Sequence, residues 1–222
     1  MLPRAAPDTA LLIDAAGTLL RPAESVPRTY ARFAARFGAR ASEAEIAAVL
    51  PGLMQQARPL RALRPDWRPY WAQVVHHATG CDDPALLDAL LDYYERPDAW
   101  RVTTGAEACA RAVAERGMKV AVVSNWDLRL RSTLQGLGVM AWIDAAIISA
   151  EVGVEKPFPG IFYRACERLA VEPSAALHVG DDPGDDVAGA RAAGCAALRW
   201  PHEVGSFAAL ARRLLSPADA TQ

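Results

Sequence analysis

Four stretches of the sequence carry side chains that could bind a metal ion and an anionic group together. They are Asp14 in ALLIDAAGTLL, the pair Ser124 and Asn125, Lys156 in EKPFPGIF, and the acidic run GDDPGDD at 180–186. A carboxylate can coordinate a cation or attack an electrophile, and oxygen ligands in a loop suit Mg²⁺. A hydroxyl, an amide and an ammonium group can each donate hydrogen bonds to anionic oxygens. These residue types predict metal-assisted chemistry on an anionic substrate such as a phosphate.

Each stretch also has a purely structural interpretation. An Asp after a strand can cap the next turn, Ser-Asn can begin a helix, and a lone Lys can simply be solvated. The acidic run could be a surface turn, although carboxylates this dense repel one another unless a cation or hydrogen bonds compensate. All four features follow predicted strands in order, and this common placement favours one shared site over four separate caps and turns.

Short apolar runs bounded by turn residues predict the strands that position these side chains. The runs cover 11–13, 119–123, 145–148, 175–179 and 195–198. Helical patterns separate the later runs, and this alternation predicts right-handed crossovers between parallel strands. We therefore expect an α/β fold with a Rossmann-like parallel sheet and helices on both of its faces. Open sheets of this kind bind ligands at the carboxyl ends of their strands, which is where the four stretches fall.

The sequence between the first strand and residue 100 has a different pattern. Residues 25–98 contain no strand-like apolar run, and four helical patterns occupy them instead. The motif SEAE, which begins at Ser42, has the form of a capping box and opens the second of these helices. We predict an α/β core domain formed by 1–20 and 100–222, with an inserted all-α cap domain at 21–99.

The ordered motifs resemble those of the haloacid dehalogenase-like (HAD) hydrolases, and the resemblance covers nearly the whole chain. The matches are DAAGT at 14–18 with one departure from the family's DxDGT, Ser124-Asn125, Lys156 in EKPFPGIF, and Gly180-Asp181-Asp182 with Asp186. The helical insertion is similar to the small α-helical cap of that family.

The resemblance implies a hydrolase of the Mg²⁺-dependent phosphatase or phosphotransferase type, acting on a small phosphorylated metabolite. In such enzymes the first Asp forms an aspartyl-phosphate that water then hydrolyses. The resemblance makes Asp14 the nucleophile and a metal ligand, together with the backbone carbonyl of Ala16 and the carboxylate of Asp181. Lys156 and Ser124 are the further catalytic residues that it implies.

The remaining site residues follow from the same resemblance. The phosphate group is expected to contact Thr18, Ser124, Asn125 and Lys156. Asp186 is expected to orient Lys156 or a water at the metal, and Asp182 to substitute for it in part. Trp126, which follows Asn125, and Trp71 in the cap are possible substrate contacts, although cap aromatics also pack a small core.

Ala16 stands where the family has the Asp that acts as general acid. Its side chain carries no proton, and general acid catalysis typically contributes roughly 10²–10⁴-fold. One explanation is a substrate whose leaving group needs no proton, such as an acyl phosphate, an aryl phosphate or a phosphonate. A second is another proton donor, with His76, His77 and Asp127 as the choices. A third is a non-catalytic or regulatory protein that binds metal and phosphate.

Two related activities rank lower. Haloacid dehalogenases also lack the second Asp but need no metal, whereas this chain retains the acidic run that would bind one. The phosphonoacetaldehyde hydrolases, which cleave a C–P bond, have Ala at this place but use a lysine of the cap. Residues 22–98 of this chain contain no Lys.

The composition restricts the partners and the compartment. A net charge of −2 and a pI near 6.1 give no basic footprint for nucleic acid. No apolar run approaches the roughly 18 residues of a membrane span, and MLPRAAPDT lacks the form of a signal peptide. The four cysteines are far apart with no CxxC, which favours reduced thiols over zinc. We expect a cytoplasmic monomer or homodimer that binds a small anionic substrate and neither nucleic acid nor a membrane.

Overall fold

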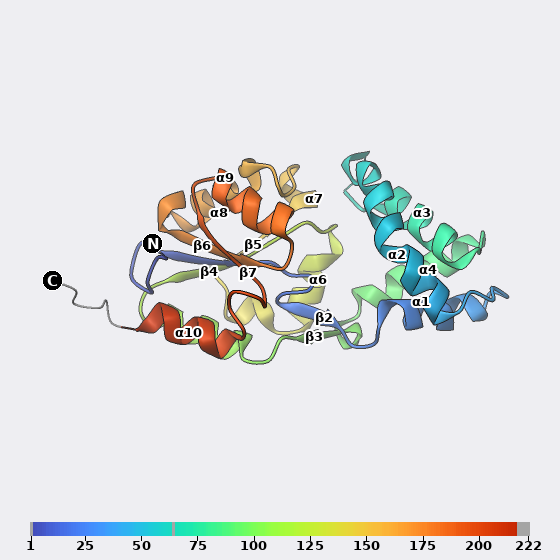
Figure 1. Ribbon diagram of the computed structural model, residues 1–222, viewed down its shortest axis with the longest axis horizontal. Coiled ribbons are helices and arrows are strands. Elements are labelled where there is room, and N and C mark those ends of the chain that lie inside the picture. Colours follow the sequence, from blue (N-terminus) through green and yellow to red (C-terminus); the bar gives the residue numbers. More distant parts are fainter. Residues whose placement is uncertain (1, 64, 217–222) are drawn as a thin grey trace. The chain divides into compact units, whose positions relative to one another are not determined.

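The computed structural model describes residues 2–63 and 65–216, which form two compact units (Figure 1). Among these residues, the first unit takes the chain up to Arg21, then Val102–Trp126 and everything from Leu134 onward. The second unit takes Pro22–Arg101 together with the short segment Asp127–Thr133. The chain therefore enters the second unit twice, and the second entry begins directly after Trp126.

The first unit contains the five-stranded sheet that the sequence predicted. The strands are β1 (Ala10–Ile13), β4 (Lys119–Ser124), β5 (Ala145–Ile148), β6 (Ala176–Gly180) and β7 (Ala196–Arg199). Their order is β5-β4-β1-β6-β7, and every neighbouring pair is parallel. The Rossmann-like α/β fold is thus confirmed, and the central position of β1 places its carboxyl end between those of β4 and β6.

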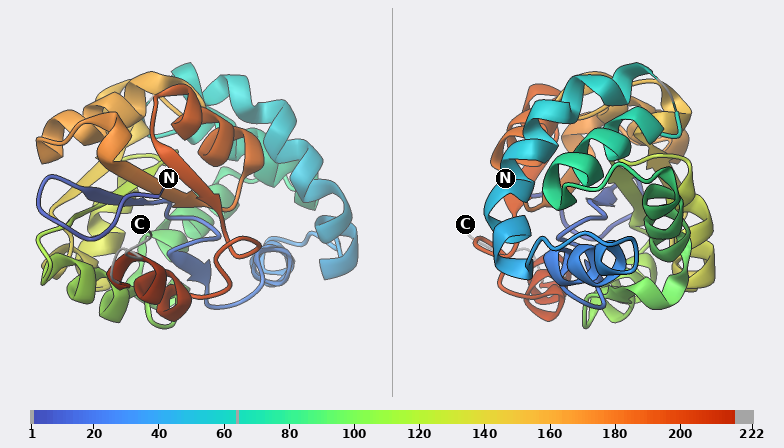
Figure 2. Two further views of the ribbon diagram at one scale, coloured as in Figure 1. Left: turned by 60° about the vertical axis from the view of Figure 1, so that its left-hand side comes forward. Right: turned by 90° about the vertical axis from the view of Figure 1, so that its right-hand side faces the viewer.

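Helices cover both faces of this sheet, as Figure 2 shows. The helices of this unit are α5 (Ala106–Ala114), α7 (Ser149–Val152), α8 (Pro159–Leu169), α9 (Gly189–Ala192) and α10 (Phe207–Leu215), while α6 (Arg129–Gly136) begins in the second unit and ends in the first. Helices α8 and α9 lie on one face, and α5 and α10 lie on the other. Because both faces are covered, β1 is buried along its whole length, which explains its continuous apolar sequence.

The second unit is built from helices around a core of its own. They are α1 (Val26–Ala35), α2 (Glu43–Ala57), α3 (Arg68–Thr79) and α4 (Pro84–Glu95), with a 3₁₀ turn at Arg58–Leu63. The capping box predicted at Ser42 is present, since its hydroxyl accepts from Glu45 N and the Glu45 carboxylate accepts from Ser42 N. Aromatic and aliphatic side chains, among them Tyr30, Tyr70 and Leu86, fill the core of this unit.

A second, two-stranded sheet joins β2 (Leu20–Pro22) to β3 (Trp100–Val102), where the chain leaves the first unit and returns to it. The sequence did not predict these strands. Each has three residues, and only the first residue of each is buried, so neither has an apolar run to reveal it. Pro22 is the last residue of β2, a position where the missing N–H breaks no central ladder.

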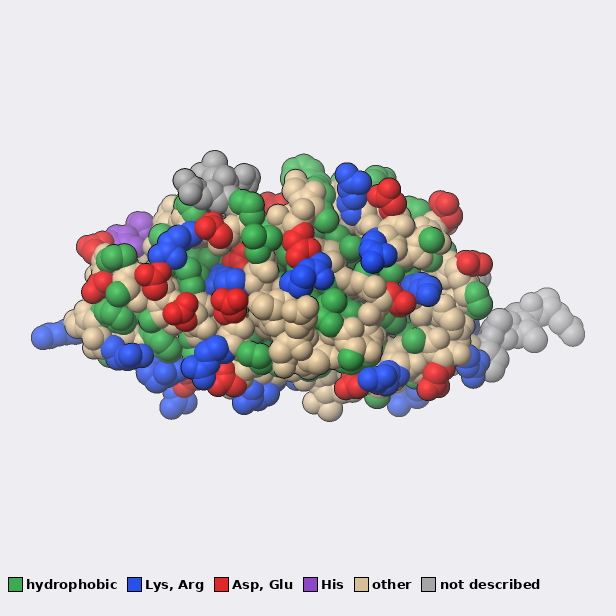
Figure 3. Space-filling view, turned by 180° about the vertical axis from the view of Figure 1, so that it is seen from behind, with side chains coloured by type: hydrophobic (Ala, Val, Ile, Leu, Met, Phe, Trp, Pro, Cys, Tyr) green, Lys and Arg blue, Asp and Glu red, His purple; other side chains and the backbone are tan. Residues whose placement is uncertain are grey.

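Acidic and basic side chains are intermixed on the face that Figure 3 shows. Within the described residues, no helix combines the length and the apolar character needed to cross a lipid bilayer. All four cysteines are free thiols, and Cys109, Cys166 and Cys195 are buried.

Candidate active site

Asp14 follows β1 directly, and a tight loop holds its backbone in place. Its N–H continues the sheet by donating to Val179 O at 2.9 Å, and its carbonyl accepts from Leu19 N at 3.1 Å. The loop turns at Gly17, whose φ of 80° lies in the region that glycine tolerates best. Asp14 is only 5% exposed. The loop therefore presents a buried carboxylate at the carboxyl end of the central strand.

Lys156 reaches Asp14 from the loop that follows α7. Its Nζ donates to Asp14 Oδ1 at 2.5 Å, to Asp186 Oδ1 at 2.6 Å and to Val123 O at 3.2 Å. The residue is 2% exposed, so this lysine is not the solvated side chain that the plainer interpretation allowed. The ammonium group thus connects the carboxylate that follows β1 to a carboxylate in the turn Pro183–Ala188 that follows β6.

Ser124 and Asn125, at the end of β4, make different kinds of contact. The Ser124 hydroxyl is buried and donates to Asp14 Oδ1 at 3.3 Å. The Asn125 amide instead binds the backbone of Lys156, accepting from its N–H at 2.7 Å and donating to its carbonyl at 2.9 Å. The sequence analysis assigned Asn125 to a phosphate group, but the structure uses its amide to fix the loop that carries Lys156.

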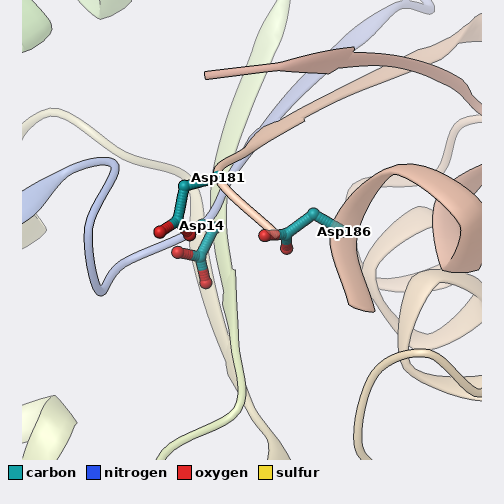
Figure 4. A group of neighbouring side chains, drawn as sticks. All are labelled: Asp14, Asp181 and Asp186. Carbon is teal, nitrogen blue, oxygen red and sulfur yellow. The ribbon is translucent and has the colours of Figure 1, made fainter. Parts of the chain in front are cut away.

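The acidic run after β6 divides into two parts. Asp14, Asp181 and Asp186 point their carboxylates toward one another, with one oxygen of each inside a 4.8 Å group (Figure 4). Asp182 is not in this group. Its carboxylate caps the π-helical turn Pro183–Ala188 by accepting from Gly184 N and Asp185 N, each at 2.7 Å. The expected partial substitution of Asp182 for Asp186 is therefore not what the geometry favours.

Two glycines allow these carboxylates to approach. A Cβ on Gly17 would lie 2.4 Å from Asp181 Oδ2, and a Cβ on Gly180 would lie 2.1 Å from Asp186 Cγ. Real Cβ atoms do not come this close, so both positions require the absence of a side chain. The motif glycines are thus explained by packing against the acidic group.

We expect Gly180→Ala to displace Asp186 and to destabilise the protein. Overpacking of this kind typically costs about 1–3 kcal/mol, and the displaced carboxylate should also weaken Mg²⁺ binding. Chemical unfolding and calorimetry with Mg²⁺ would measure the two effects. Gly52→Ala is the matched control, because a Cβ there meets nothing within 4 Å. Equal stability and equal Mg²⁺ affinity of the two variants would contradict the packing argument.

The charges of the group are unbalanced. Burial raises the pKa of Asp14 to about 7, Lys156 opposes this, and the charges of Asp186 and Asp181 add to it. Burial and the neighbouring Asp186 also raise the pKa of Asp181. Although burial favours its neutral amine, Lys156 has a raised pKa because Asp14 and Asp186 hold its proton. The positive charge of Lys156 offsets the negative charge of only one of the three carboxylates. The other two need a bound cation or protons to balance their charge.

The donor set fits Mg²⁺. Clustered carboxylate oxygens at a loop are its preferred protein ligands, and it usually completes its shell with water and substrate oxygens. Asp14 and Asp181 would hold the ion. The backbone carbonyl of Ala16, two residues after Asp14, is the third expected ligand. The Thr18 hydroxyl is buried and finds no hydrogen-bond partner among the described residues, whereas the Thr18 carbonyl accepts from Thr103 Oγ1 at 2.7 Å. A hydroxyl of this kind could donate a hydrogen bond to an anionic oxygen.

We expect Mg²⁺ to bind more tightly as the pH rises toward 7. A proton on Asp14 competes with the ion below its pKa of about 7, so the affinity should rise up to tenfold per pH unit and then level off. Calorimetric titration between pH 5.5 and 8.5 would measure this. Asp14→Asn should bind more weakly and remove the part of the slope that belongs to Asp14. An affinity of the wild type that does not change over this range would contradict the assignment of Asp14 as a ligand.

The three residues considered as substitutes for the missing acid have hydrogen-bond or ion-pair partners within the second unit. Asp127 belongs to the second unit, is fully buried, and accepts from Arg129 Nε at 3.0 Å and from Trp71 Nε1 at 3.1 Å. Both of these hydrogen bonds lie within the second unit. His77 and His76 also belong to the second unit, where they bond to Gln73 O and pair with Asp82, respectively.

The two tryptophans named as substrate contacts are both half-buried. The indole N–H of Trp71 donates to Asp127 Oδ2 at 3.1 Å within the second unit. Trp126 lies in the first unit directly after Asn125, and its backbone N–H donates to Ser149 Oγ at 3.1 Å.

The sequence analysis missed one residue that contacts the site. His178 lies inside β6, is fully buried, and places Nε2 2.8 Å from Asp186 Oδ1. Burial lowers the pKa of His178, although the bond to Asp186 opposes this. The sequence contained a signal for this residue, because His178 is a polar residue inside the apolar run ALHV, just before the acidic run.

Comparisons with known proteins point to one family. The family model described as haloacid dehalogenase-like hydrolase matches residues 9–194. Haloacid dehalogenase-like hydrolase domain-containing protein 3 from Mus musculus is 40% identical over 57% of this chain and 53% of that protein. The Homo sapiens protein of the same name is 33% identical over 82% of this chain and 77% of that protein. The matched part thus spans about half the length of the mouse relative and more of the human one.

Solved structures agree on the fold and differ in activity. An L-2-haloacid dehalogenase from Xanthobacter autotrophicus has a TM-score of 0.69 at 25% identity, covering 96% of this chain and 84% of that chain. A HAD phosphatase from Thermococcus onnurineus has a TM-score of 0.62 at 26% identity, covering 86% of this chain and 85% of that chain. Because both activities occur on this fold, the choice between them rests on the site.

Proposed function

Because the chain belongs to the haloacid dehalogenase-like hydrolases, we propose that it is an Mg²⁺-dependent phosphatase with Asp14 as its nucleophile. The observation that carries the proposal is the group formed by three carboxylates and Lys156 at the carboxyl end of β1. A dehalogenase needs no metal, whereas this site gathers the exposed Asp181 and the buried Asp186 beside Asp14, a set of carboxylates that suits a cation. The similarity to a HAD phosphatase is consistent with this choice.

Each residue of the site has a separate role in the proposed reaction. The oxygen Asp14 Oδ1 accepts from Lys156 and Ser124, which leaves Oδ2 as the oxygen that attacks phosphorus. The attack makes a P–O bond to Asp14 and breaks the bond to the leaving group. In this reaction Lys156 and Ser124 would hold the transferring oxygens, and water would then cleave the aspartyl-phosphate to release phosphate and restore Asp14. When bound, Mg²⁺ would supply charge neutralisation between Asp14 and the phosphoryl oxygens.

Ala16 restricts the substrate. It is exposed on the loop after Asp14 and has no proton to give to a leaving group. We therefore propose a small phosphorylated metabolite with a leaving group that departs unprotonated, an acyl phosphate being the simplest. An ordinary alkyl phosphate should be hydrolysed roughly 10²–10⁴-fold more slowly than it would be with a general acid at residue 16.

The test is hydrolysis of acetyl phosphate, p-nitrophenyl phosphate and a sugar phosphate by the wild type, with Mg²⁺ and with a chelator. We expect Mg²⁺-dependent turnover of the first two and little of the third. Hydrolysis of a 2-haloacid in the chelator, without any phosphatase activity, would overturn the proposal.

A second candidate, favoured by the same Ala16, is a regulatory protein that binds metal and phosphate without turnover. Its signature would be Mg²⁺-dependent binding of inorganic phosphate with no hydrolysis of either activated substrate. Calorimetry beside the activity assay separates the two candidates.

A further inference from the structure

His178 is a buried polar residue that no step of the proposed reaction uses. It lies on β6 between Leu12 of β1 and Ala197 of β7 in the sheet register. Its ring is fully buried and meets the ring of Phe162 edge-on, with centroids 5.1 Å apart and planes at 77°. A buried imidazole costs free energy unless it forms a hydrogen bond, so the side-chain partner that His178 has is informative.

That contact is with Asp186 Oδ1, 2.8 Å from His178 Nε2. An ionised carboxylate only accepts, so Nε2 carries the proton and donates it. The same oxygen accepts from Lys156 Nζ at 2.6 Å, while Asp186 Oδ2 accepts from Asp182 N at 3.0 Å. Three donors thus fix both oxygens of Asp186 in direction.

The bonds run on from Asp186 to the nucleophile. Lys156 Nζ, which donates to Asp186 Oδ1, also donates to Asp14 Oδ1 at 2.5 Å. Asp186 also lies in the 4.8 Å group with Asp14 and Asp181, so it could turn toward a cation there if it were not held. If the Asp186 carboxylate rotated in that way, Lys156 would lose its hydrogen bond to Asp186 Oδ1.

We propose that His178 is a positioning residue, which holds Asp186 on Lys156 and so keeps the ammonium group against Asp14. The kinetic consequence rests on the proposed phosphatase function, but the placement of Lys156 does not. Residues that orient a site from outside in this way typically contribute about 10–100-fold when removed.

Two amide variants give a matched comparison. In His178→Gln the amide nitrogen can reach the place of Nε2 and donate to Asp186, whereas in His178→Asn it is too short to do so. We expect His178→Asn to lower kcat for acetyl phosphate about 10–100-fold with little change in KM, and His178→Gln to recover most of the loss. Leu177→Val, buried on the other face of β6, controls for a loss of packing.

Lysine NMR gives a readout that does not depend on turnover. The chain has two lysines, Lys119 and Lys156, and Lys119 is exposed. In protein labelled with ¹³C,¹⁵N-lysine, the Lys156 side-chain signals should shift or broaden in His178→Asn and return in His178→Gln. Lys119 should not move in either variant, and Leu177→Val should leave both lysines unchanged.

Lys156 signals that are the same in the wild type and in His178→Asn would overturn the positioning role, as would a His178→Gln variant that behaves like His178→Asn. If the wild type hydrolyses no phosphate ester or acyl phosphate, the proposed function fails and the NMR comparison still decides the role of His178. Thermal unfolding of each variant shows that the compared proteins are folded.

Discussion

Asp14→Asn should abolish Mg²⁺-dependent hydrolysis of acetyl phosphate and p-nitrophenyl phosphate. The amide that replaces the carboxylate is a poor nucleophile, so the aspartyl-phosphate route closes. Losses on removing a catalytic nucleophile are on the order of 10⁴-fold or more. Steady-state assays with purified protein would measure the change, and the fold should survive because Asn is close to Asp in size.

The matched control is Asp8→Asn, at the other end of β1. Asp8 is exposed and has a φ of 65°, a conformation that Asn also tolerates. We expect this variant to keep full activity and stability. Turnover that persists in Asp14→Asn would remove the nucleophile from the proposed mechanism. An equal loss in both variants would point to damage to the fold instead.

The sheet and its strand ends were predictable because strands buried on both faces read as unbroken apolar runs. The run at Lys119–Ser124 and the capping box at Ser42 are signals of this local kind. The two three-residue strands β2 and β3 have no such signal, since most of each strand is not buried. The π-helical turn Pro183–Ala188 was not predicted, because its Gly, Pro and Asp residues are typical of a loop.

The site was predictable in its residue types and less so in its contacts. Lys156 and Asp14 come together because parallel strands bring their carboxyl ends to one edge of the sheet. The contact between Asn125 and the Lys156 backbone depends on loop geometry that residue types do not encode. In the same way, the hydrogen bond from Trp71 to Asp127 joins residues that are 56 positions apart in the sequence. No local pattern assigns the segment Asp127–Thr133 to the second unit.

Ala16→Asp should raise hydrolysis of a sugar phosphate by roughly 10²–10⁴-fold while changing acetyl phosphate turnover little. The reason is that an alkoxide leaving group needs a proton and an acyl phosphate does not. Ala16 is exposed, so an Asp side chain has room there, unlike at Gly17, where a Cβ would strike Asp181. The ratio of kcat/KM for the two substrates, in wild type and variant, is the quantity to measure.

Ala16→Asn separates the acid from the size of the side chain, because it has the shape of Asp and no acidic proton. We expect no gain in Ala16→Asn, and no gain in Ala16→Asp when Asp14 is also changed to Asn. A gain that appears only with both carboxylates present means that Asp14 already performs the nucleophilic step and that residue 16 limits leaving-group departure. If Ala16→Asp gains nothing while acetyl phosphate turnover is intact, the barrier for sugar phosphates lies outside the loop that follows β1, and the restriction assigned to Ala16 is wrong.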